Sequence, residues 1–416
     1  MSVLSLAFLS SYKAAAEEVF DWRACIKEAS KSHPDLISAE EVVKQSEAAK
    51  KVTASALFPQ INSSLDAVTG RNDNGIASGT GDTYTYGVDG SQLVFDGMKT
   101  INNVNAAKEN IKAAKEGFRF TSVDVRLRLR TAFINLLTAQ ESIQIAEDIY
   151  KIRSKNLALI MLRYRSGLEH KGALLTAEAN LSQAKLGTAV AKRDVAVARR
   201  QLAKEMGKID FTSLAVNGDF EVKEPVVKKP DFDVLVKNNP SLQKLIAQAN
   251  SADFGVRSAY ANFSPTLSGT ASANKNDSHW TPHDDQWDLG LNLSMPIFEG
   301  GLRIAQVEQA KATLNQLKAN EQSTRDGLIF TLEQTWALLE DAIDNVKVQN
   351  EILVATEERS KIAQVQYSTG FITFDNWTII EDNLVSAKNN YLKAQSNALL
   401  AEANWVKAKG ETLEYE

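Results

Sequence analysis

The stretch TLSGTASAN, from Thr266 to Asn274, alternates between polar and small or apolar residues. The stretch DLGLNLSM, from Asp288 to Met295, alternates in the same way with larger apolar residues. Because successive side chains of a strand point to opposite faces, each stretch predicts a β-strand with one polar and one apolar face. Strands of this kind are typical of a membrane β-barrel with a polar interior.

The first half of the chain contains a weaker version of this pattern. Apolar or aromatic residues alternate with polar ones around Leu65 and again around Tyr86. We therefore predict four strands of about ten residues, the length that crosses a bilayer obliquely. The predicted strands cover residues about 60–69, 84–95, 266–274 and 287–297, with outward-facing polar loops from Arg71 to Asp82 and from Lys275 to Asp285.

The chain is an internal duplication. A shift of 206 residues superimposes the beginnings of the two halves, and a shift of 203 superimposes the regions that follow the strands. The matched pairs include Pro34 with Pro240, Pro59 with Pro265, Phe95 with Phe298, Gly97 with Gly300, Gly167 with Gly370 and Gly207 with Gly410. The second register holds over roughly 100 residues without a gap, which indicates rigid elements because loops tolerate insertions.

Long helices follow the second strand of each copy. Between Lys99 and Arg165 there is no proline and one glycine, Gly117, and a helix of this span is about 100 Å long at 1.5 Å per residue. Apolar residues recur every seven positions along it, which predicts coiled-coil packing. A second, alanine-rich helix is expected to return antiparallel, so that helical hairpins cover residues about 98–206 and 301–409.

The remaining segments complete the predicted domain organisation. The apolar stretch from Val3 to Tyr12 precedes three alanines, which predicts a signal peptide at residues 1–16 that is removed. The first repeat then covers residues 17–207, a linker 208–230, the second repeat 231–410 and a C-terminal tail 411–416. The linker is expected to be partly ordered, with a short strand formed from Phe220, Val222, Val226 and Val227.

The composition argues against several functions. The chain has 47 Lys and Arg against 52 Asp and Glu, a formal net charge of −5. No stretch concentrates basic residues, so nucleic acid is not an expected partner. No run of 18 apolar residues occurs, so a membrane-spanning helix is not predicted. The single cysteine, Cys25, follows a helix N-cap at Asp21 and is predicted to be a buried helix residue rather than a lipidation site.

No catalytic pattern is present. The chain lacks the phosphate-binding motif Gly-x-x-x-x-Gly-Lys and the nucleophile motif Gly-x-Ser-x-Gly, so we predict that it is not an enzyme and uses no cofactor. His279 and His283 are four residues apart, but Pro282 places them in a loop, and no metal site is predicted. His33 and His170 have no obvious acidic partner in the sequence.

The predicted strands require assembly. Four strands cannot close a barrel, and an open sheet edge in lipid leaves backbone groups unpaired. Two copies would supply eight strands, whose side chains largely fill the interior, whereas three copies would supply twelve and leave a lumen. A homotrimer is therefore expected.

Four motifs, placed in order on this repeat, carry a family resemblance. They are VFDG (Val94–Gly97), RYRSGL (Arg163–Leu168), PIFEGG (Pro296–Gly301) and QYSTGF (Gln366–Phe371). With them the chain resembles the TolC family of outer-membrane efflux proteins. The resemblance implies a mixed α+β membrane fold. A trimeric twelve-stranded outer-membrane β-barrel, with four strands per chain, would continue into a twelve-helix periplasmic α-barrel of coiled-coil hairpins.

The resemblance also implies a function and a location. The chain would be the outer-membrane channel subunit of a tripartite efflux or type I secretion system, a passive duct with a large periplasmic portion. Its expected partners are two further copies, outer-membrane lipid, a periplasmic adaptor (membrane fusion) protein and, indirectly, an inner-membrane transporter that supplies the energy.

The resemblance assigns adaptor docking to the two turns between long helices. The residues are Tyr164, Ser166, Gly167, Leu168, Tyr367, Thr369, Gly370 and Phe371. The two glycines also have a purely structural explanation, because a tight turn requires positive φ.

The tunnel mouth departs from the family pattern. Other members narrow it with aspartates six and nine residues after the second-turn glycine and an arginine two residues after it. Here these positions are Asn376, Ile379 and Ile372. The family's acidic gate is therefore not reproduced, and Asp375, Glu381 and Asp382 are added as candidate gate residues.

Two other classes of protein fit parts of the pattern. A soluble long coiled-coil scaffold without channel activity would explain the helices, but not the strands with one polar face. A trimeric surface adhesin is disfavoured because the outward loops are short. The sequence does not indicate whether the exported cargo is a drug, a metal ion or a polypeptide.

Overall fold

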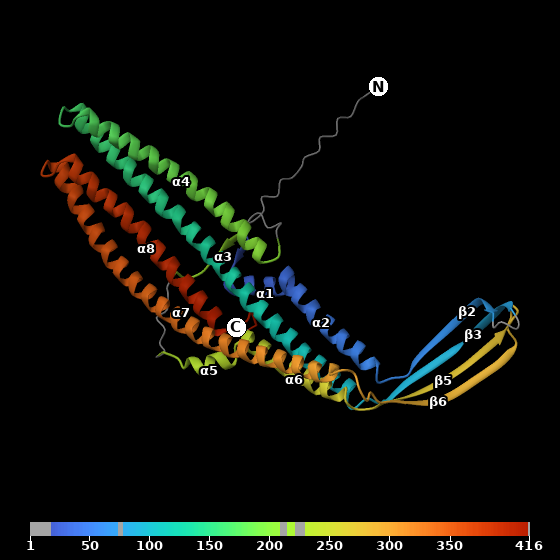
Figure 1. Cartoon of the computed structure of the whole chain (residues 1–416). Coiled ribbons are helices and arrows are strands. Elements are labelled where there is room, and N and C mark those ends of the chain that lie inside the picture. The colour runs from blue at the N-terminus through green and yellow to red at the C-terminus, as the bar shows by residue number, and fades with distance from the viewer. Residues whose placement is uncertain (1–17, 74–77, 209–213, 221–228, 415–416) are drawn as a thin grey trace, which may run out of the picture. The chain divides into compact units, whose positions relative to one another are not determined.

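The computed structural model describes residues 18–73, 78–208, 214–220 and 229–414. The predicted signal peptide lies outside these residues, as do Val222, Val226 and Val227 of the predicted linker strand. The elements (Figure 1) are β1 (Glu18–Phe20), α1 (Trp22–Ser32), α2 (Pro34–Ser55), β2 (Gln60–Asp73), β3 (Ser78–Phe95), α3 (Lys99–Arg165), α4 (Lys171–Glu205), β4 (Leu214–Val216), α5 (Phe232–Lys237), α6 (Pro240–Ala261), β5 (Thr266–Asp277), β6 (Asp284–Ser294), α7 (Leu302–Thr369) and α8 (Phe374–Lys409).

Corresponding helices of the two repeats have nearly equal lengths. α2 and α6 contain 22 residues each, α3 and α7 contain 67 and 68, and α4 and α8 contain 35 and 36. The expected long helices are therefore present. Since propensity alone rarely sustains helices of this length, their apolar stripes must be stabilised by packing along their length.

The two helical hairpins contact each other through α3 and α8. The first hairpin is α3 with α4 and the second is α7 with α8, and α3 lies against α8 (Figure 1). Ile134 of α3 packs on Leu399 and Ala403 of α8. The Thr138 hydroxyl donates a hydrogen bond of 3.0 Å to the Ser396 hydroxyl. We call this α3–α8 contact the seam.

The four long strands form one antiparallel sheet in the order β2-β3-β5-β6 (Figure 1). β2 pairs with β3 and β5 pairs with β6 inside the repeats, while β3 pairs with β5 across them. The registers align Asn62, Asp89, Ser272 and Asp288 in one row and Ile61, Gly90, Ala271 and Leu289 in the next. Because neighbouring rows point to opposite faces, one face of the sheet is polar and the other is apolar.

The described strands extend further than the sequence predicted. β2 continues to Asp73 and β3 begins at Ser78, so most of the predicted loop from Arg71 to Asp82 is strand. The second predicted loop is also shorter, because β5 ends at Asp277 and β6 begins at Asp284. Backbone pairing continues past the last apolar side chain since ladder hydrogen bonds do not depend on side-chain polarity. β6 in turn ends at Ser294, earlier than predicted, before Pro296, which has no N–H to donate.

A short parallel sheet was not predicted. Glu18–Phe20 pairs with Leu214–Val216, so the segment before α1 and the linker form β1 and β4. The Gln140 side chain on α3 holds β4, accepting from the Val216 N–H at 3.0 Å and donating to its carbonyl at 2.9 Å. Pairings of three residues between distant segments leave no periodic signal in a sequence.

The predicted C-terminal tail is packed where the structure describes it. Thr412 and Leu413 are buried. Arg126 donates a hydrogen bond of 2.7 Å to the Thr412 carbonyl, and the Leu413 N–H donates to the Ser122 hydroxyl at 3.1 Å. The segment therefore belongs to the helical core around α3.

The chain divides into two compact units that cut across the repeats. One contains residues 1–37, 120–235 and 328–416, and the other contains 38–119 and 236–327. α3 and α7 contribute to both units because each is too long for one. The predicted division into two repeats and the division into compact units therefore cut the chain at different places.

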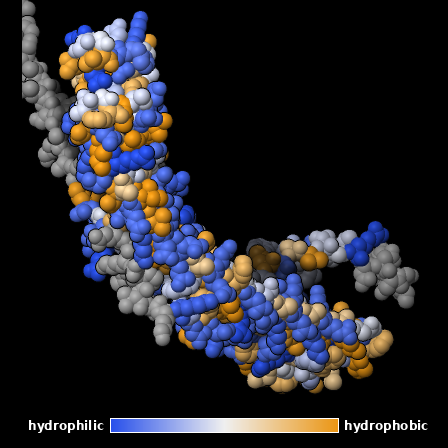
Figure 2. Space-filling view, turned by 90° about the vertical axis from the view of Figure 1, so that its left-hand side faces the viewer, coloured by the Kyte–Doolittle hydropathy of each residue, from blue (hydrophilic) through white to orange (hydrophobic). Residues whose placement is uncertain are grey.

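Apolar residues are distributed over the surface. Figure 2 shows hydrophobic patches among hydrophilic residues on the face in view. Large exposed apolar residues on the long helices include Leu186, Val197, Phe330, Val354 and Val365. Among the described helices, none combines the length and the hydropathy needed to cross a bilayer.

Candidate functional site at the helix turns

The two turns between long helices share one backbone geometry. Gly167 has φ 72° and Gly370 has φ 85°, a left-handed conformation that L-residues avoid. In the first turn the Leu168 N–H donates to the Arg163 carbonyl at 2.9 Å, and in the second the Phe371 N–H donates to the Gln366 carbonyl at 2.8 Å. These bonds satisfy carbonyls at the helix ends and fix the direction of each turn.

The following helices are capped by side chains. His170 Nδ1 accepts a hydrogen bond of 3.1 Å from the Ala173 N–H at the start of α4. Thr373 is the corresponding N-cap of α8 and accepts from the Asn376 N–H at 3.4 Å. Both turns are therefore held at both ends, so that the residues on them have defined positions.

Seven of the eight predicted docking residues are exposed. Among them, Leu168 is 67% exposed on the first turn and Phe371 is 82% exposed on the second. The eighth, Tyr367, is 1% exposed and belongs to the core. A contact between Tyr367 and an incoming partner is therefore not available in this conformation.

Tyr367 instead connects the two hairpins. Its hydroxyl donates a hydrogen bond of 2.6 Å to Oε2 of Glu169 on the first turn. The Arg163 guanidinium lies 4.8 Å from the centre of its ring and donates to its carbonyl at 3.2 Å. Burial of the ring, together with the bond to Glu169, raises the pKa of the Tyr367 hydroxyl, so it stays protonated as the donor.

Trp377 on α8 supports the same side chain. Its ring stacks on Tyr367 with centroids 4.4 Å apart and planes at 12°. Both belong to a buried cluster drawn from all four long helices, which is completed by Ile160, Ala173, Ala177, Ala363 and Phe374. The second turn is therefore anchored by aromatic packing, and the first turn contributes polar contacts to it.

The candidate gate residues occupy very different environments. Asp375, Asn376 and Ile379 are exposed and Ile372 is half-buried. Glu381 is 4% exposed and accepts hydrogen bonds of 2.5 Å from Ser360 and 3.2 Å from Asn156. Since Asn156 lies on α3, Glu381 forms a buried polar link across the seam.

Asp382 forms a second link beside it. Arg153 of α3, itself buried, donates a hydrogen bond of 2.5 Å to the Asp382 carboxylate. The two side chains also line a cavity of about 670 Å³ between α3, α4 and α8. Ala184, Gly187 and Ala191 form part of its wall, so the small residues of α4 leave the space open. The structure thus brings Glu381 and Asp382 together with partners that the sequence did not indicate.

The histidines also have acidic neighbours, contrary to the sequence analysis. Nε2 of buried His33 lies 3.6 Å from the Glu205 carboxylate, and Nε2 of His170 lies 3.8 Å from Glu169. His33 and Glu205 lie far apart in the chain, so only the fold reveals their proximity. Cys25 is fully buried in α1 as predicted, and burial with nearby Asp21 raises the pKa of its thiol to about 12.

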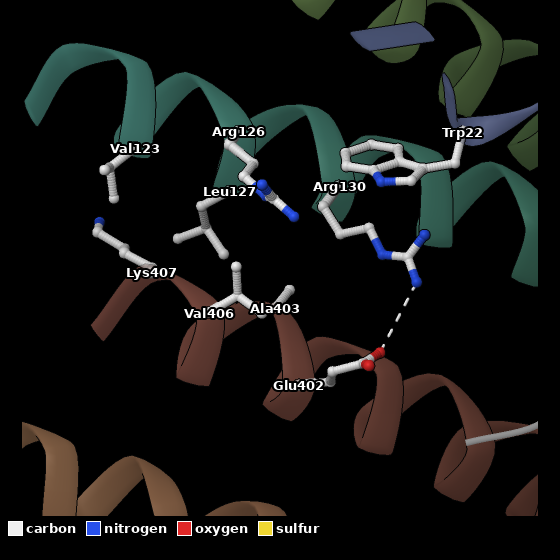
Figure 3. A pocket seen from close by; sticks show the side chains of 9 residues that line it. All are labelled: Trp22, Val123, Arg126, Leu127, Arg130, Glu402, Ala403, Val406 and Lys407. Atoms are coloured by element: carbon white, nitrogen blue, oxygen red, sulfur yellow. Dashed lines mark ion pairs between the residues drawn. The ribbon is translucent and has the colours of Figure 1, made fainter. Parts of the chain in front are cut away.

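A pocket of about 100 Å³ lies between α3 and α8, near Trp22 (Figure 3). The Arg130 guanidinium lies 5.0 Å from the centre of the Trp22 ring and 3.7 Å from the Glu402 carboxylate. Lys407 pairs with Asp124 at 3.0 Å. Because its charged side chains pair within the chain, this pocket joins α1 to the seam and is assigned a structural role.

Comparison with known proteins agrees with this architecture. The chain is 23% identical over 318 residues to the outer membrane efflux protein BepC of Brucella suis. This alignment covers 74% of this chain and 67% of BepC. It is 26% identical over 247 residues to the alkaline protease secretion protein AprF of Pseudomonas aeruginosa, covering 53% of this chain and 51% of AprF. A crystal structure of a Pseudomonas aeruginosa membrane protein has a TM-score of 0.85 at 16% identity and covers 93% of both chains.

Long helical hairpins together with a four-stranded sheet that has one polar face are the fold that the chain shares with this membrane protein. The outer membrane efflux protein family model matches residues 25–208 and 233–411, and the chain belongs to this family. The predicted resemblance to the TolC family is thereby confirmed. The chain is a subunit of an outer-membrane efflux or secretion channel with a periplasmic part, and members of this family are channel proteins rather than enzymes.

Proposed function

We propose that three copies of the chain form a passive duct that docks a periplasmic adaptor at its helix turns. The duct itself catalyses no reaction, and its energy comes through the adaptor from an inner-membrane transporter. The sheet supports a trimer, because β2 and β6 are its end strands and three copies would supply twelve strands around a lumen.

The observation that best supports docking at the helix turns is the pair of exposed apolar side chains there. Leu168 and Phe371 project from backbones that are fixed by a left-handed glycine and a capped helix. Because the backbone of each turn is already fixed, docking costs little backbone conformational entropy, and each exposed side chain can bury apolar surface against a partner. Tyr164, Ser166, Thr369 and the two glycines complete the proposed docking surface.

We assign Tyr367 a different role from the other seven residues. Its contacts with Glu169 and Arg163 hold the second turn against the first, so it positions the docking surface without touching the partner. The Arg153–Asp382 and Asn156–Glu381 links hold the hairpins together next to it. These links replace the acidic gate in our proposal: widening the mouth requires α8 to move away from α3 and these hydrogen bonds to break.

The adaptor and the transporter, rather than the duct, select the class of cargo. One relative is named as an efflux protein and another as a protease secretion protein. A passive duct admits either cargo once it is open, so we place the choice of cargo in the adaptor and transporter.

Site-specific cross-linking tests the docking surface. Single cysteines replace Leu168 or Phe371 in trimers made together with candidate periplasmic adaptors, and a thiol-to-amine reagent is added. Val197→Cys on α4 is the control, since Val197 is exposed and lies far from the turns in the sequence. Cys25 need not be removed, because its protonated, buried thiol is unreactive. Adaptor adducts from Leu168→Cys and Phe371→Cys alone support the proposal, and equal adducts from Val197→Cys contradict it.

A further inference from the structure

The two proposed docking turns differ in the chemistry of the helix caps that follow them. His170 Nδ1 accepts the Ala173 N–H at the start of α4, and the Thr373 hydroxyl accepts the Asn376 N–H at the start of α8. These positions correspond in pairs through the 203-residue shift. A hydroxyl oxygen accepts at any physiological pH, whereas an imidazole nitrogen accepts only while it carries no proton. Protonation can therefore remove the first cap and cannot remove the second.

A second pair of helix starts shows the same difference between the repeats. His33 Nδ1 accepts the Asp35 N–H at 3.1 Å at the start of α2. At the corresponding position before α6, Asn239 accepts the Ser241 N–H at 2.9 Å through an amide oxygen, which does not titrate. His33 is 4% exposed, whereas the His170 side chain is 68% exposed. Because solvent reaches its ring, His170 is the cap that responds directly to the surrounding pH.

The chain leaves space for the imidazole at the start of α4. A Cβ at Gly172 would lie 3.0 Å from His170 Nδ1, which is a tight contact. The position that corresponds to Gly172 in the second hairpin is Asp375, and there the cap is the smaller Thr373. The glycine therefore lets the ring approach the first N–H groups of α4.

The charges at the start of α4 oppose a positively charged ring. The first turn of α4 contains no acidic residue and begins with Lys171, whereas the first turn of α8 contains Asp375. The N-terminus of a helix carries a partial positive charge and disfavours a cation placed on it. Oε1 of Glu169 lies 3.8 Å from His170 Nε2. Since the ring is exposed, this ion pair contributes little, and the lost cap outweighs it.

Glu169 connects the histidine to the hydrogen bond between the two turns. Its Oε1 accepts the His170 N–H at 3.2 Å, and its Oε2 accepts the Tyr367 hydroxyl at 2.6 Å. Arg163 of α3 lies 3.9 Å from the same Oε2. With Lys171, these are the charged and titratable members of the network around His170. A protonated ring adds a cation beside Glu169 and competes with Tyr367 for its carboxylate.

We propose that protonation of His170 releases the first docking turn, so that adaptor docking weakens as the periplasm becomes acidic. The inference rests on the proposed function and specifies how its docking surface is regulated. The cap is intact above the range in which histidines take up a proton, about pH 8 to 5, and is lost as the pH falls through it. Leu168 then loses its fixed position, whereas Phe371, which precedes the Thr373 cap, keeps its own.

Spin labelling tests the release on the full-length protein purified in detergent. A nitroxide is attached to Leu168→Cys or, in a separate variant, to Phe371→Cys. Electron paramagnetic resonance spectra are recorded at about pH 7.5 and about pH 5.5, on either side of the usual histidine range. One N-cap changes a helix equilibrium by about fivefold, so the mobile fraction of the Leu168→Cys label should rise about fivefold at the lower pH. The Phe371→Cys label should not respond.

Two variants exchange the caps between the turns. His170→Thr copies the cap of the second turn and should make the Leu168→Cys label insensitive to pH. Thr373→His combined with Asp375→Gly places the histidine and its glycine on the second turn and should transfer the response to the Phe371→Cys label. A response that persists in His170→Thr, that is equal at both labels with the original caps, or that is absent altogether overturns the inference.

Adaptor binding separates the inference from the proposed function. The affinity of a candidate periplasmic adaptor is measured at both pH values for the unmodified chain and for His170→Thr. Binding that weakens about fivefold at the lower pH in the unmodified chain, relative to His170→Thr, supports the inference. Equal affinity at both pH values overturns the regulation and leaves the docking surface standing. No binding at either pH overturns the docking surface itself, while the labels still decide whether the turn is released.

Discussion

The two helix turns are equivalent in backbone and different in their surroundings. Tyr164 and Tyr367 occupy the same position of the repeat, three residues before the turn glycine. Tyr164 is exposed, whereas Tyr367 is buried between Arg163 and Trp377 and bonded to Glu169. The comparison teaches that the two copies of a duplicated unit can keep the same turn geometry and still differ in role. Both turns expose an apolar side chain. The second turn also contributes the buried tyrosine that holds the two turns together.

The same division appears at the next carboxylates along the return helices. Glu178 of α4 and Glu381 of α8 correspond in the repeat. Glu178 is exposed, and Glu381 is buried across the seam between Ser360 and Asn156. Polar groups that are buried and fully paired are costly to disturb, which makes the second hairpin the more sensitive partner.

The largest expected difference in stability is between loss of the buried Trp377 ring and loss of the exposed Phe371 ring. Trp377→Ala removes a buried ring that packs on Tyr367, and a loss of about 3–5 kcal/mol of stability is expected. Phe371→Ala removes an exposed ring of the same turn and should change stability by less than about 0.5 kcal/mol. Thermal unfolding of the detergent-solubilised proteins measures both changes, and similar midpoints for the two variants would show that the anchor is elsewhere.

Removal of one hydroxyl from each tyrosine compares the turns directly. Tyr367→Phe leaves the Glu169 carboxylate without its 2.6 Å donor, and a loss of about 1–3 kcal/mol is expected. Tyr164→Phe removes an exposed group and should be close to neutral. If the two substitutions shift the unfolding midpoint equally, the hydrogen bond between the turns does not contribute to stability.

Glu381 and Glu178, which occupy corresponding positions of the repeat, allow the same comparison of stability further along the hairpins. Glu381→Ala leaves Ser360 and Asn156 unpaired inside the seam, at a cost of about 1–3 kcal/mol. Glu178→Ala has no such consequence, because Glu178 is exposed. Unfolding in the same detergent compares the two. An equal loss for both variants would contradict the assignment of Glu381 as a link.

The smallest expected difference in stability is between alanine substitutions of the two turn glycines. Gly167→Ala and Gly370→Ala each place a Cβ at positive φ, and each should cost about 1–2 kcal/mol. Because their φ values are 72° and 85°, the two losses should agree within error. Unequal losses would show that the turns differ in backbone as well as in their contacts.

Periodic features of the molecule could be predicted from the sequence, and non-periodic ones could not. The seven-residue and two-residue patterns indicated the long helices and the four strands, and Asp21 indicated the start of α1, where its side chain accepts from the Ala24 N–H at 2.7 Å. The pairing of β1 with β4 and the contact of His33 with Glu205 join distant segments of a few residues each, for which no local pattern exists.

The candidate site shows the same limit. The turns and their glycines follow from the repeat, because helix ends have a sequence signature. The burial of Tyr367 does not, since Tyr164 occupies an equivalent position and is exposed. What distinguishes them is Trp377 and Glu169, and the counterpart of Trp377 is Leu174 in α4, without an aromatic ring. A comparison of the two repeats position by position would have marked this difference without revealing the contact.

Conductance in a planar bilayer tests most directly the claim that contacts between the two hairpins close the mouth of an outer-membrane channel. The purified protein is expected to conduct weakly, and Arg153→Ala combined with Tyr367→Phe to conduct several-fold more, while Tyr164→Phe remains at the level of the unmodified chain. Equal conductance of the double variant and the unmodified chain would contradict the account.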